Sequence, residues 1–178
     1  MKKYSFLSII ILASVMLPSC IKEDVKIFTG ATVVEFDAAV FNSATSGFTY
    51  PILTRAAGFG RAISTSLDPL ITRASGTVRL RVNLVGPQST SAETINYTVI
   101  STPVLTGTNQ HAVSGTHFTT SGTTTIPANS SFAEITITII NPGTSSAVQR
   151  EVHLELSGNA TIKPSENYKK VAIRISQS

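Results

Sequence analysis

The stretch Thr77-Val78-Arg79-Leu80-Arg81-Val82-Asn83-Leu84 decides the fold of this chain. Apolar and polar residues alternate through it without interruption, so every second side chain falls on the same face. A period of two is typical of a β-strand that has one face in a core and the other in solvent. Gly86 and Pro87 end the run, and Thr94–Ile100 alternates next. We therefore predict a half-buried strand that forms a hairpin with the following one.

Similar runs rich in Val, Ile and Thr lie on both sides of this strand, separated by Gly, Pro, Asn and Ser. They fall at Ala31–Asp37, Phe48–Thr54, Phe132–Ile140, Glu151–Leu156 and Lys170–Ile175. Pro51 favours a sheet edge for the second of these runs, because proline cannot donate a ladder hydrogen bond. No long segment shows a helical period. The chain is thus predicted to be all-β, with about 7–9 antiparallel strands in a two-sheet sandwich.

The alternation also assigns the two faces of each strand. The inner faces are expected to hold Val34, Phe36, Ile95, Tyr97, Val99, Val152, Leu154, Leu156, Val171, Ile173 and Ile175. The outer faces are expected to hold Glu35, Asp37, Glu151, His153 and Glu155.

The N-terminal residues have the pattern of a secretion signal. Lys2 and Lys3 precede an apolar run, Phe6–Leu17, that is too short to span a bilayer. Leu17-Pro18-Ser19-Cys20 then resembles the bacterial lipobox, in which the cysteine thiol is acylated and becomes the first residue of the mature protein. This resemblance implies a lipoprotein signal peptide at residues 1–19.

The cleaved chain would then consist of a lipidated tether, residues 20–29, and one sandwich domain, residues 30–178. Lys22, Glu23 and Asp24 resemble the signal that exports lipoproteins of the Bacteroidota to the outside of the outer membrane. The alternative is a charged, solvated spacer. We expect an outer-membrane protein that contacts the membrane through its lipid anchor and faces the cell surface.

Cysteine content and charge exclude several classes of function. The chain has 1 cysteine, which lipidation would consume, so neither a disulfide nor thiol redox chemistry is available. The formal net charge of +4 includes Lys2 and Lys3, and the other basic residues are scattered. Nucleic-acid binding is therefore not expected, because a phosphate backbone requires a basic patch.

One segment, residues 55–75, lacks the alternation of apolar and polar residues that marks the strands. It contains Gly58-Phe59-Gly60 and the three arginines Arg55, Arg61 and Arg73. Long connections of this kind are often functional, so Arg55, Phe59, Arg61 and Arg73 form a possible ligand loop. The alternative is an irregular insertion with a short extra hairpin.

Acidic residues give little support for catalysis. A glycoside hydrolase needs two carboxyl groups separated by roughly 5–9.5 Å. Glu151 and Glu155 would lie about 13 Å apart on one strand, whereas Glu35 and Asp37 would lie about 7 Å apart. The second pair is better explained as the solvated face of a strand. We expect no enzyme activity.

The histidines and aromatic residues are candidates for binding roles. His111 and His117 lack a third nearby ligand for zinc, and we expect no metal and no cofactor. The chain has 0 Trp, which leaves Phe48, Tyr50 and Phe59 as candidate platforms for a sugar. Each could equally be ordinary core or edge packing.

The C-terminal part, about residues 95–178, carries a family resemblance. The segments that carry it are Gly115–Phe118, Gly122–Asn129, Ile135–Ile140 and Val152–Leu156. Their layout of turn, strand, turn, strand and strand resembles a Calx-beta domain, and the chain as a whole is similar to uncharacterised lipoproteins of the Bacteroidota. The resemblance implies an immunoglobulin-like β-sandwich.

Calcium binding is not implied by this resemblance. His117 stands where the family turn has an acid, and Asn141–Ser146 contains none, whereas Ca²⁺ needs several oxygen ligands. A site would have to recruit Glu35 or Asp37. We expect a non-enzymatic envelope lipoprotein, a binding or structural module for an envelope protein or glycan and an accessory to glycan uptake. The alternatives are a calcium-dependent adhesive module or, third, a hydrolase.

Overall fold

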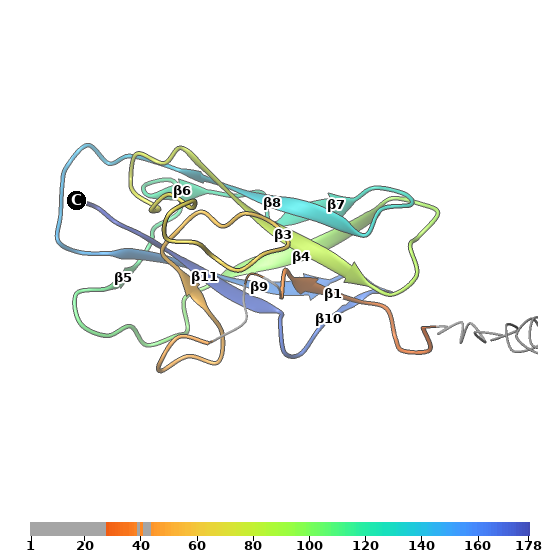
Figure 1. Cartoon of the computed structure of the whole chain (residues 1–178). Helices are drawn as coiled ribbons and strands as arrows, with labels where there is room; N and C mark the ends of the chain where they lie inside the picture. Colours follow the sequence, from red (N-terminus) through yellow and green to blue (C-terminus); the bar gives the residue numbers. More distant parts are fainter. Residues whose placement is uncertain (1–27, 39, 41–43) are drawn as a thin grey trace, which may run out of the picture.

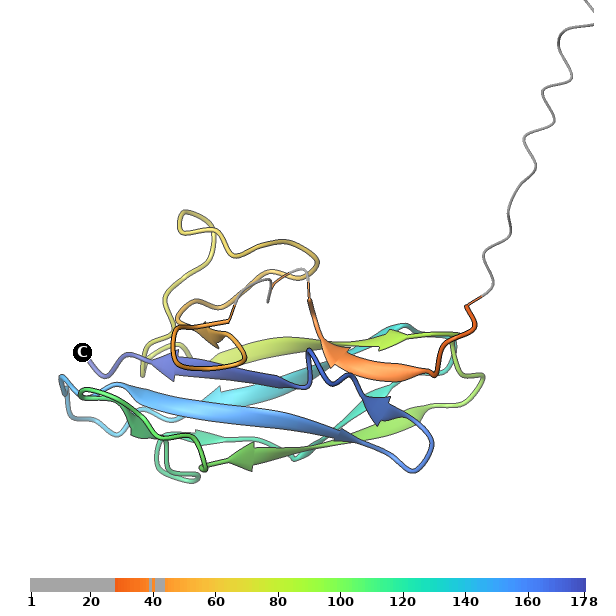
Figure 2. The same ribbon diagram turned by 90° about the horizontal axis from the view of Figure 1, so that it is seen from below.

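The computed structural model describes residues 28–38, 40 and 44–178. The predictions for the signal peptide, Cys20, Lys22, Glu23 and Asp24 lie outside the described residues. Within them the chain forms eleven strands in two sheets and has no helix, so nothing described there could cross a membrane as an apolar helix. Figures 1 and 2 show the two sheets packed face to face.

The first sheet is built around β3 (Thr77–Val85), the strand with the uninterrupted alternation. Its strand order is β10-β1-β3-β8-β6. The strands are β1 (Val33–Phe36), β3 (Thr77–Val85), β6 (Phe118–Thr119), β8 (Phe132–Ile139) and β10 (Lys163–Pro164). β3 pairs antiparallel with both neighbours, which places Leu84 opposite Val34 and Leu80 opposite Ile135.

The second sheet contains the remaining six strands. Its order is β2-β11-β9-β4-β7, and β5 also pairs with β9. The strands are β2 (Ile52–Leu53), β4 (Glu93–Ile100), β5 (Gln110–His111), β7 (Thr123–Ile126), β9 (Arg150–Gly158) and β11 (Lys170–Ile175). β2 lies at the edge, as Pro51 predicted, and β9 lies in the middle.

The core fills the space between the two sheets. The largest fully buried side chains include Phe36, Leu80, Ile135, Leu154, Leu156 and Ile173. They occupy alternate positions of their strands, as the period of two requires. The prediction of an all-β, immunoglobulin-like sandwich is thereby confirmed. The strands outnumber the prediction because β5, β6 and β10 are pairs of residues too short to leave an alternating pattern and β7 (Thr123–Ile126) has four residues, whereas the predicted run Phe48–Thr54 is a strand only at Ile52–Leu53.

Three details of the predicted sheet are wrong. β3 and β4 do not form a hairpin, because β3 lies between β1 and β8 while β4 lies in the other sheet. Three pairings, β1 with β10, β2 with β11 and β5 with β9, are parallel. Val99 is 44% exposed because β7 pairs only with the first half of β4, which leaves the end of β4 at an open edge.

Residues 54–71 form a closed excursion that packs on the sandwich. An isolated antiparallel bridge joins Arg55 to Leu70 at its base, and Ile71 enters the core. Asp37, predicted to face solvent, is buried at 3% exposure and accepts a hydrogen bond at Oδ2 from the Gly60 amide at 2.8 Å. The excursion therefore covers the end of β1, which local alternation could not predict.

The described chain begins at one end of the sandwich. The turn at residues 44–51 and the connection at residues 101–109 lie toward the opposite end (Figures 1 and 2). These two segments cover part of the outer face of the second sheet, and they shape the candidate site.

Candidate functional site

Two polar side chains of β9 are buried on the outer face of the second sheet. Glu151 is 1% exposed and His153 is 0% exposed, although their alternation with Val152 and Leu154 predicted solvent exposure. The alternation itself is correct, because Val152 and Leu154 point into the core. The prediction of exposure is wrong because segments distant in sequence cover this part of the sheet.

The first covering segment is a tight turn before β2. The Phe48 amide donates to the Thr45 carbonyl at 2.9 Å, and the Thr45 amide donates to the Tyr50 carbonyl at 3.2 Å. The Thr45 hydroxyl accepts a hydrogen bond from the Ile52 amide at 2.9 Å. These bonds fold residues 45–50 back on themselves and present Phe48 and Tyr50 to the sheet.

The second covering segment is the connection between β4 and β5. β4 ends with Ile100 opposite His153, and β5 resumes along the same strand with His111 opposite Glu151. Residues 101–109 therefore leave the sheet and return to it. His111 Nε2 lies 2.9 Å from the Pro103 carbonyl oxygen, which fastens this excursion to β5.

Three ring systems surround the His153 imidazole. The Phe48 ring is stacked on it with 5.7 Å between centroids and an interplanar angle of 29°. The Tyr50 and His111 rings meet it edge-on at 5.9 and 5.3 Å. Ala172, which lies opposite His153 on β11, is fully buried, and its small side chain leaves room for these rings.

Four side chains form a continuous hydrogen-bonded series, which we call the relay: Arg174, Glu151, His153 and Tyr50. Arg174 Nε donates to Glu151 Oε1 at 2.7 Å, and Glu151 Oε2 lies 2.9 Å from His153 Nε2. His153 Nδ1 lies 2.9 Å from the Tyr50 hydroxyl. The relay therefore ties the 45–50 turn to β9 and β11.

Charge and burial set the proton affinities of the relay. Burial alone would raise the pKa of Glu151, but the hydrogen bonds of His153 and Arg174 outweigh it and lower the pKa below its ordinary value. Burial raises the pKa of Tyr50, and the negative charges of Glu151 and Glu155 raise it further. Glu151 is thus a carboxylate, and Tyr50 is a protonated phenol.

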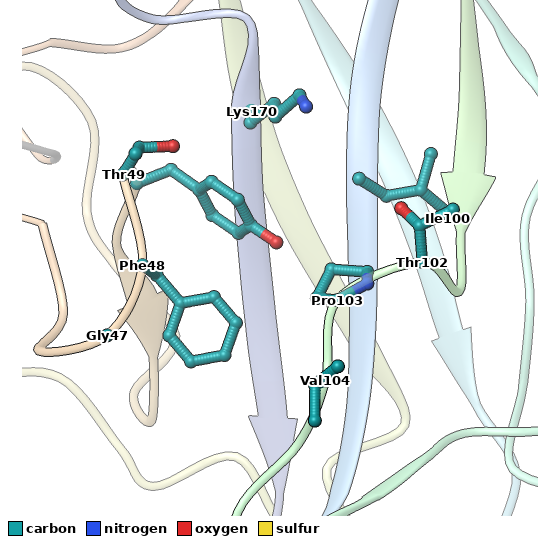
Figure 3. A pocket seen from close by; sticks show the side chains of 9 residues that line it. Gly47, Phe48, Thr49, Ile100, Thr102, Pro103, Val104 and Lys170 are labelled. Carbon is teal, nitrogen blue, oxygen red and sulfur yellow. The ribbon is translucent and has the colours of Figure 1, made fainter.

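A pocket of about 330 Å³ opens between the turn and the connection. It is lined by Gly47, Phe48, Thr49, Tyr50, Ile100, Thr102, Pro103, Val104 and Lys170. Figure 3 shows Phe48 and Thr49 on one side, Thr102, Pro103 and Val104 on the other, and Lys170 at one end. Its size falls at the lower end of the range for small-ligand sites, roughly 300–1,000 Å³.

The sequence identified part of this pocket. Phe48 and Tyr50, two of the three aromatic candidates, lie together in it, whereas Phe59 is on the separate 54–71 excursion at 38% exposure. Sequence reasoning missed the 101–104 wall and the relay. The available signal was the Glu-x-His spacing of Glu151 and His153, which places a carboxylate and an imidazole on one face of a strand.

The predicted ligand loop is held together by its own polar groups. Arg61 donates two hydrogen bonds to the Asp68 carboxylate at 2.9 and 2.5 Å, and Arg55 donates to the Asp68 carbonyl at 2.6 Å. Arg73 lies apart from them and reaches Asn141 at 3.2 Å. The structure thus brings Arg55 and Arg61 together around Asp68, and a ligand role for this loop stays a prediction.

His117 and the acids near β1 make no shared metal site. The His117 side chain is buried and accepts the Val113 amide hydrogen at Nδ1, at 3.0 Å, and burial lowers its pKa. His111 contacts His153 instead of His117. In the part of the chain that the structure describes, no group of three or more His, Cys, Asp and Glu could hold a metal ion.

The two curled sheets and their connections define a Calx-beta-like fold of the immunoglobulin-like class. The chain is similar to the apo form of the Calx CBD1 domain, with a TM-score of 0.50 and 13% identity over 84% of this chain and 99% of that one. No protein-family model matches the sequence, and a search of curated proteins found no match.

Two further solved structures are similar over part of their length. The calcium-binding domain CBD12 of CALX1.1 matches with a TM-score of 0.46 and 18% identity, over 60% of this chain and 40% of that one. A two-domain Bacteroides fragilis protein of unknown function matches with a TM-score of 0.49 and 8% identity, over 83% of this chain and 46% of that one.

Proposed function

We propose that this chain is a non-enzymatic, lipid-anchored module of the cell envelope that binds a glycan in the pocket beside Phe48. The observation that carries the proposal is the gathering of an aromatic ring and several hydroxyl groups in one small pocket. Aromatic faces take the apolar C–H side of a sugar ring, and hydroxyl groups of Thr49, Tyr50 and Thr102 supply hydrogen bonds.

The buried base of the pocket supports this role. Phe48 stacks on His153, which the relay fixes in orientation, so a ligand meets an aromatic wall that is already ordered. Preorganisation of this kind reduces the conformational entropy lost on binding.

An anchor at the N-terminus would present the pocket outward. Acylation at Cys20 would attach the chain to the outer membrane, and Lys22, Glu23 and Asp24 would direct it to the cell surface. Stable attachment requires more than one acyl chain, as lipoprotein acylation supplies. The described chain begins at one end of the sandwich, and the segments 44–51 and 101–109, which supply most of the pocket lining, lie toward the other end (Figure 2), so the pocket would face away from the membrane. That position suits an accessory to glycan uptake.

The relay favours a structural role over catalysis. Tyr50, His153 and Glu151 follow the order of a nucleophile, a base and an orienting carboxylate. A nucleophile must be activated, however, and burial with nearby negative charge raises the pKa of Tyr50. Glu151 is 1% exposed, so it could not reach a glycosidic bond as a hydrolase carboxylate must.

Calorimetric titration of the purified chain with a panel of oligosaccharides tests the proposal. Phe48→Ala should abolish or weaken binding by about tenfold or more, because it removes the aromatic wall. Phe59→Ala is the matched control, since Phe59 is an exposed ring on the 54–71 excursion, and it should bind like the wild type. Absence of binding by the wild type, or equal binding by both variants, would contradict the glycan site.

A further inference from the structure

The hydrogen-bond directions in the relay follow from the charge of Glu151. A carboxylate only accepts, so the proton between it and His153 belongs to His153 Nε2. Arg174 already balances the carboxylate charge, and a neutral imidazole leaves the buried group without net charge. Nδ1 of a neutral imidazole that carries its proton on Nε2 is an acceptor. The Tyr50 hydroxyl therefore donates its proton to Nδ1.

This direction fixes what Tyr50 offers to the pocket. A phenol has one proton, and His153 receives it, so any further hydrogen bond to the Tyr50 oxygen must be donated by the ligand. Lys170, at the far end in Figure 3, can only donate. The pocket therefore suits a ligand with a hydrogen-bond donor near Tyr50 and a hydrogen-bond acceptor near Lys170.

The charges around the pocket disfavour an anion. Among the lining residues that the structure describes, Lys170 is the one cation, and its Nζ lies 3.5 Å from Glu155 Oε2. Glu151 and Glu155 also impose a negative potential on Tyr50, which is one cause of its raised pKa. An acidic group would find that cation already paired with the Glu155 carboxylate.

We infer that the pocket selects neutral glycans and that a hydroxyl of the bound sugar donates a hydrogen bond to the Tyr50 oxygen. This inference rests on the proposed function and names its ligand class. Sugar hydroxyls donate and accept at adjacent carbons, so a neutral pyranose can satisfy Tyr50 and Lys170 together. A uronic acid carries a carboxylate, which only accepts hydrogen bonds, so at that position it cannot donate one to the Tyr50 oxygen.

Two sets of probes test the inference by calorimetry on the unmodified chain. The first compares neutral gluco-, manno-, galacto- and xylo-oligosaccharides with glucuronic- and galacturonic-acid oligosaccharides of equal length. Neutral sugars should bind at least about tenfold more tightly. The second uses deoxy and deoxyfluoro analogues of the tightest neutral sugar. At one ring position, the deoxy and the deoxyfluoro analogue should each bind about tenfold more weakly than the parent sugar, because fluorine cannot donate a hydrogen bond in place of the hydroxyl.

A protein variant links that ring position to Tyr50. Tyr50→Phe should bind the parent sugar and its deoxy analogue equally, as in a double-mutant cycle. Because this variant also loses the bond that holds the turn, hydrogen exchange of residues 45–50 checks that the turn stays closed. Tighter binding of uronic acids, or fluoro analogues that bind like the parent at every position, would overturn the inference. Failure of every sugar to bind would instead overturn the proposed function.

Discussion

At the scale of single residues, the burial of His153 is the most consequential feature of this molecule. A histidine with 0% exposure needs partners for both ring nitrogens, and Glu151 and Tyr50 supply them. No buried side-chain nitrogen or oxygen among the described residues lacks a hydrogen-bond partner. Removal of one member of such a network costs more than its bond, because the remaining partner is left unsatisfied.

Tyr50→Phe should lower the free energy of unfolding by about 1–2 kcal/mol, because it leaves His153 Nδ1 buried without a donor. Urea denaturation at neutral pH measures the change. Tyr168→Phe is the control, since Tyr168 is 37% exposed and its change should stay within about 0.5 kcal/mol. Equal changes in the free energy of unfolding for the two variants would show that the Tyr50 hydroxyl does not stabilise the fold.

Glu151→Gln should destabilise the fold by about 1–3 kcal/mol, because it removes the buried carboxylate that accepts a hydrogen bond from Arg174 and lies 2.9 Å from His153 Nε2. Glu155→Gln on the same strand and face is the matched control. Glu155 is 28% exposed and reaches two lysines at 3.5 and 3.9 Å, so its loss should cost less than about 1 kcal/mol. If the two variants were equally stable by urea denaturation, the relay would not be a stabilising network.

At the scale of elements, the covering segments distinguish this sandwich from a bare pair of sheets. The 54–71 excursion is held by Asp68, which is 4% exposed and accepts hydrogen bonds from Arg61 and the Ser64 amide. The hydrogen bonds from Arg61, followed by the one from Ser64, lower the pKa of Asp68 to about 2.

Acid should therefore loosen the 54–71 excursion. The pKa of Asp68 falls from an ordinary 3.8 to about 2 in the fold, so the unfolded chain takes up the proton first as the pH falls. The stabilisation is complete above about pH 4 and is lost as the pH falls through about 2. Hydrogen exchange of residues 54–71 between about pH 4 and pH 2 measures this loss of stabilisation. Asp68→Asn should remove the pH dependence, and its persistence in that variant would contradict the assignment.

Strand positions could be predicted from the sequence, but strand partners could not. The alternation at 77–84 gives the inner and outer faces of β3 because both depend only on local geometry. Whether β3 pairs with β4 or with β8 depends on contacts between residues far apart in sequence, and here β8 provides the antiparallel partner.

The candidate site, too, could be predicted from the sequence only in part. Phe48 and Tyr50 could be identified as candidates because aromatic residues are few in this chain. The burial of Glu151 and His153 could not be predicted from the sequence, because the two segments that cover them lie about 40 and 100 residues away along the chain. A polar pair on a strand face is ordinarily solvated, and here only tertiary packing buries it.

At the scale of the whole molecule, the proposed anchor and the pocket together define an orientation. The described chain enters the sandwich at one end, and the segments 44–51 and 101–109, which supply most of the pocket lining, lie toward the other end (Figure 1). A lipid at Cys20 would place the tether-proximal end near the membrane and leave the pocket accessible.

Cys20→Ser should move the protein out of the outer membrane fraction and prevent incorporation of an alkyne-labelled palmitate in cells. In the lipobox that we propose, the thiol of Cys20 is the acylation site, so serine should not replace it. Protease treatment of intact cells should digest the wild-type protein from outside. Resistance of the wild type until the outer membrane is opened would contradict surface exposure, and labelling of Cys20→Ser would contradict the anchor.

Ligand mapping by two-dimensional NMR tests whether the pocket beside Phe48 binds a neutral glycan. The isotopically labelled chain is titrated with the neutral oligosaccharide that binds most tightly in calorimetry. We expect the largest shift changes at residues 47–50, at 100–104 and at Lys170, and unchanged signals for Phe59 and the 54–71 excursion. Shift changes confined to the 54–71 excursion or to the outer face of the first sheet would contradict a glycan site in this pocket.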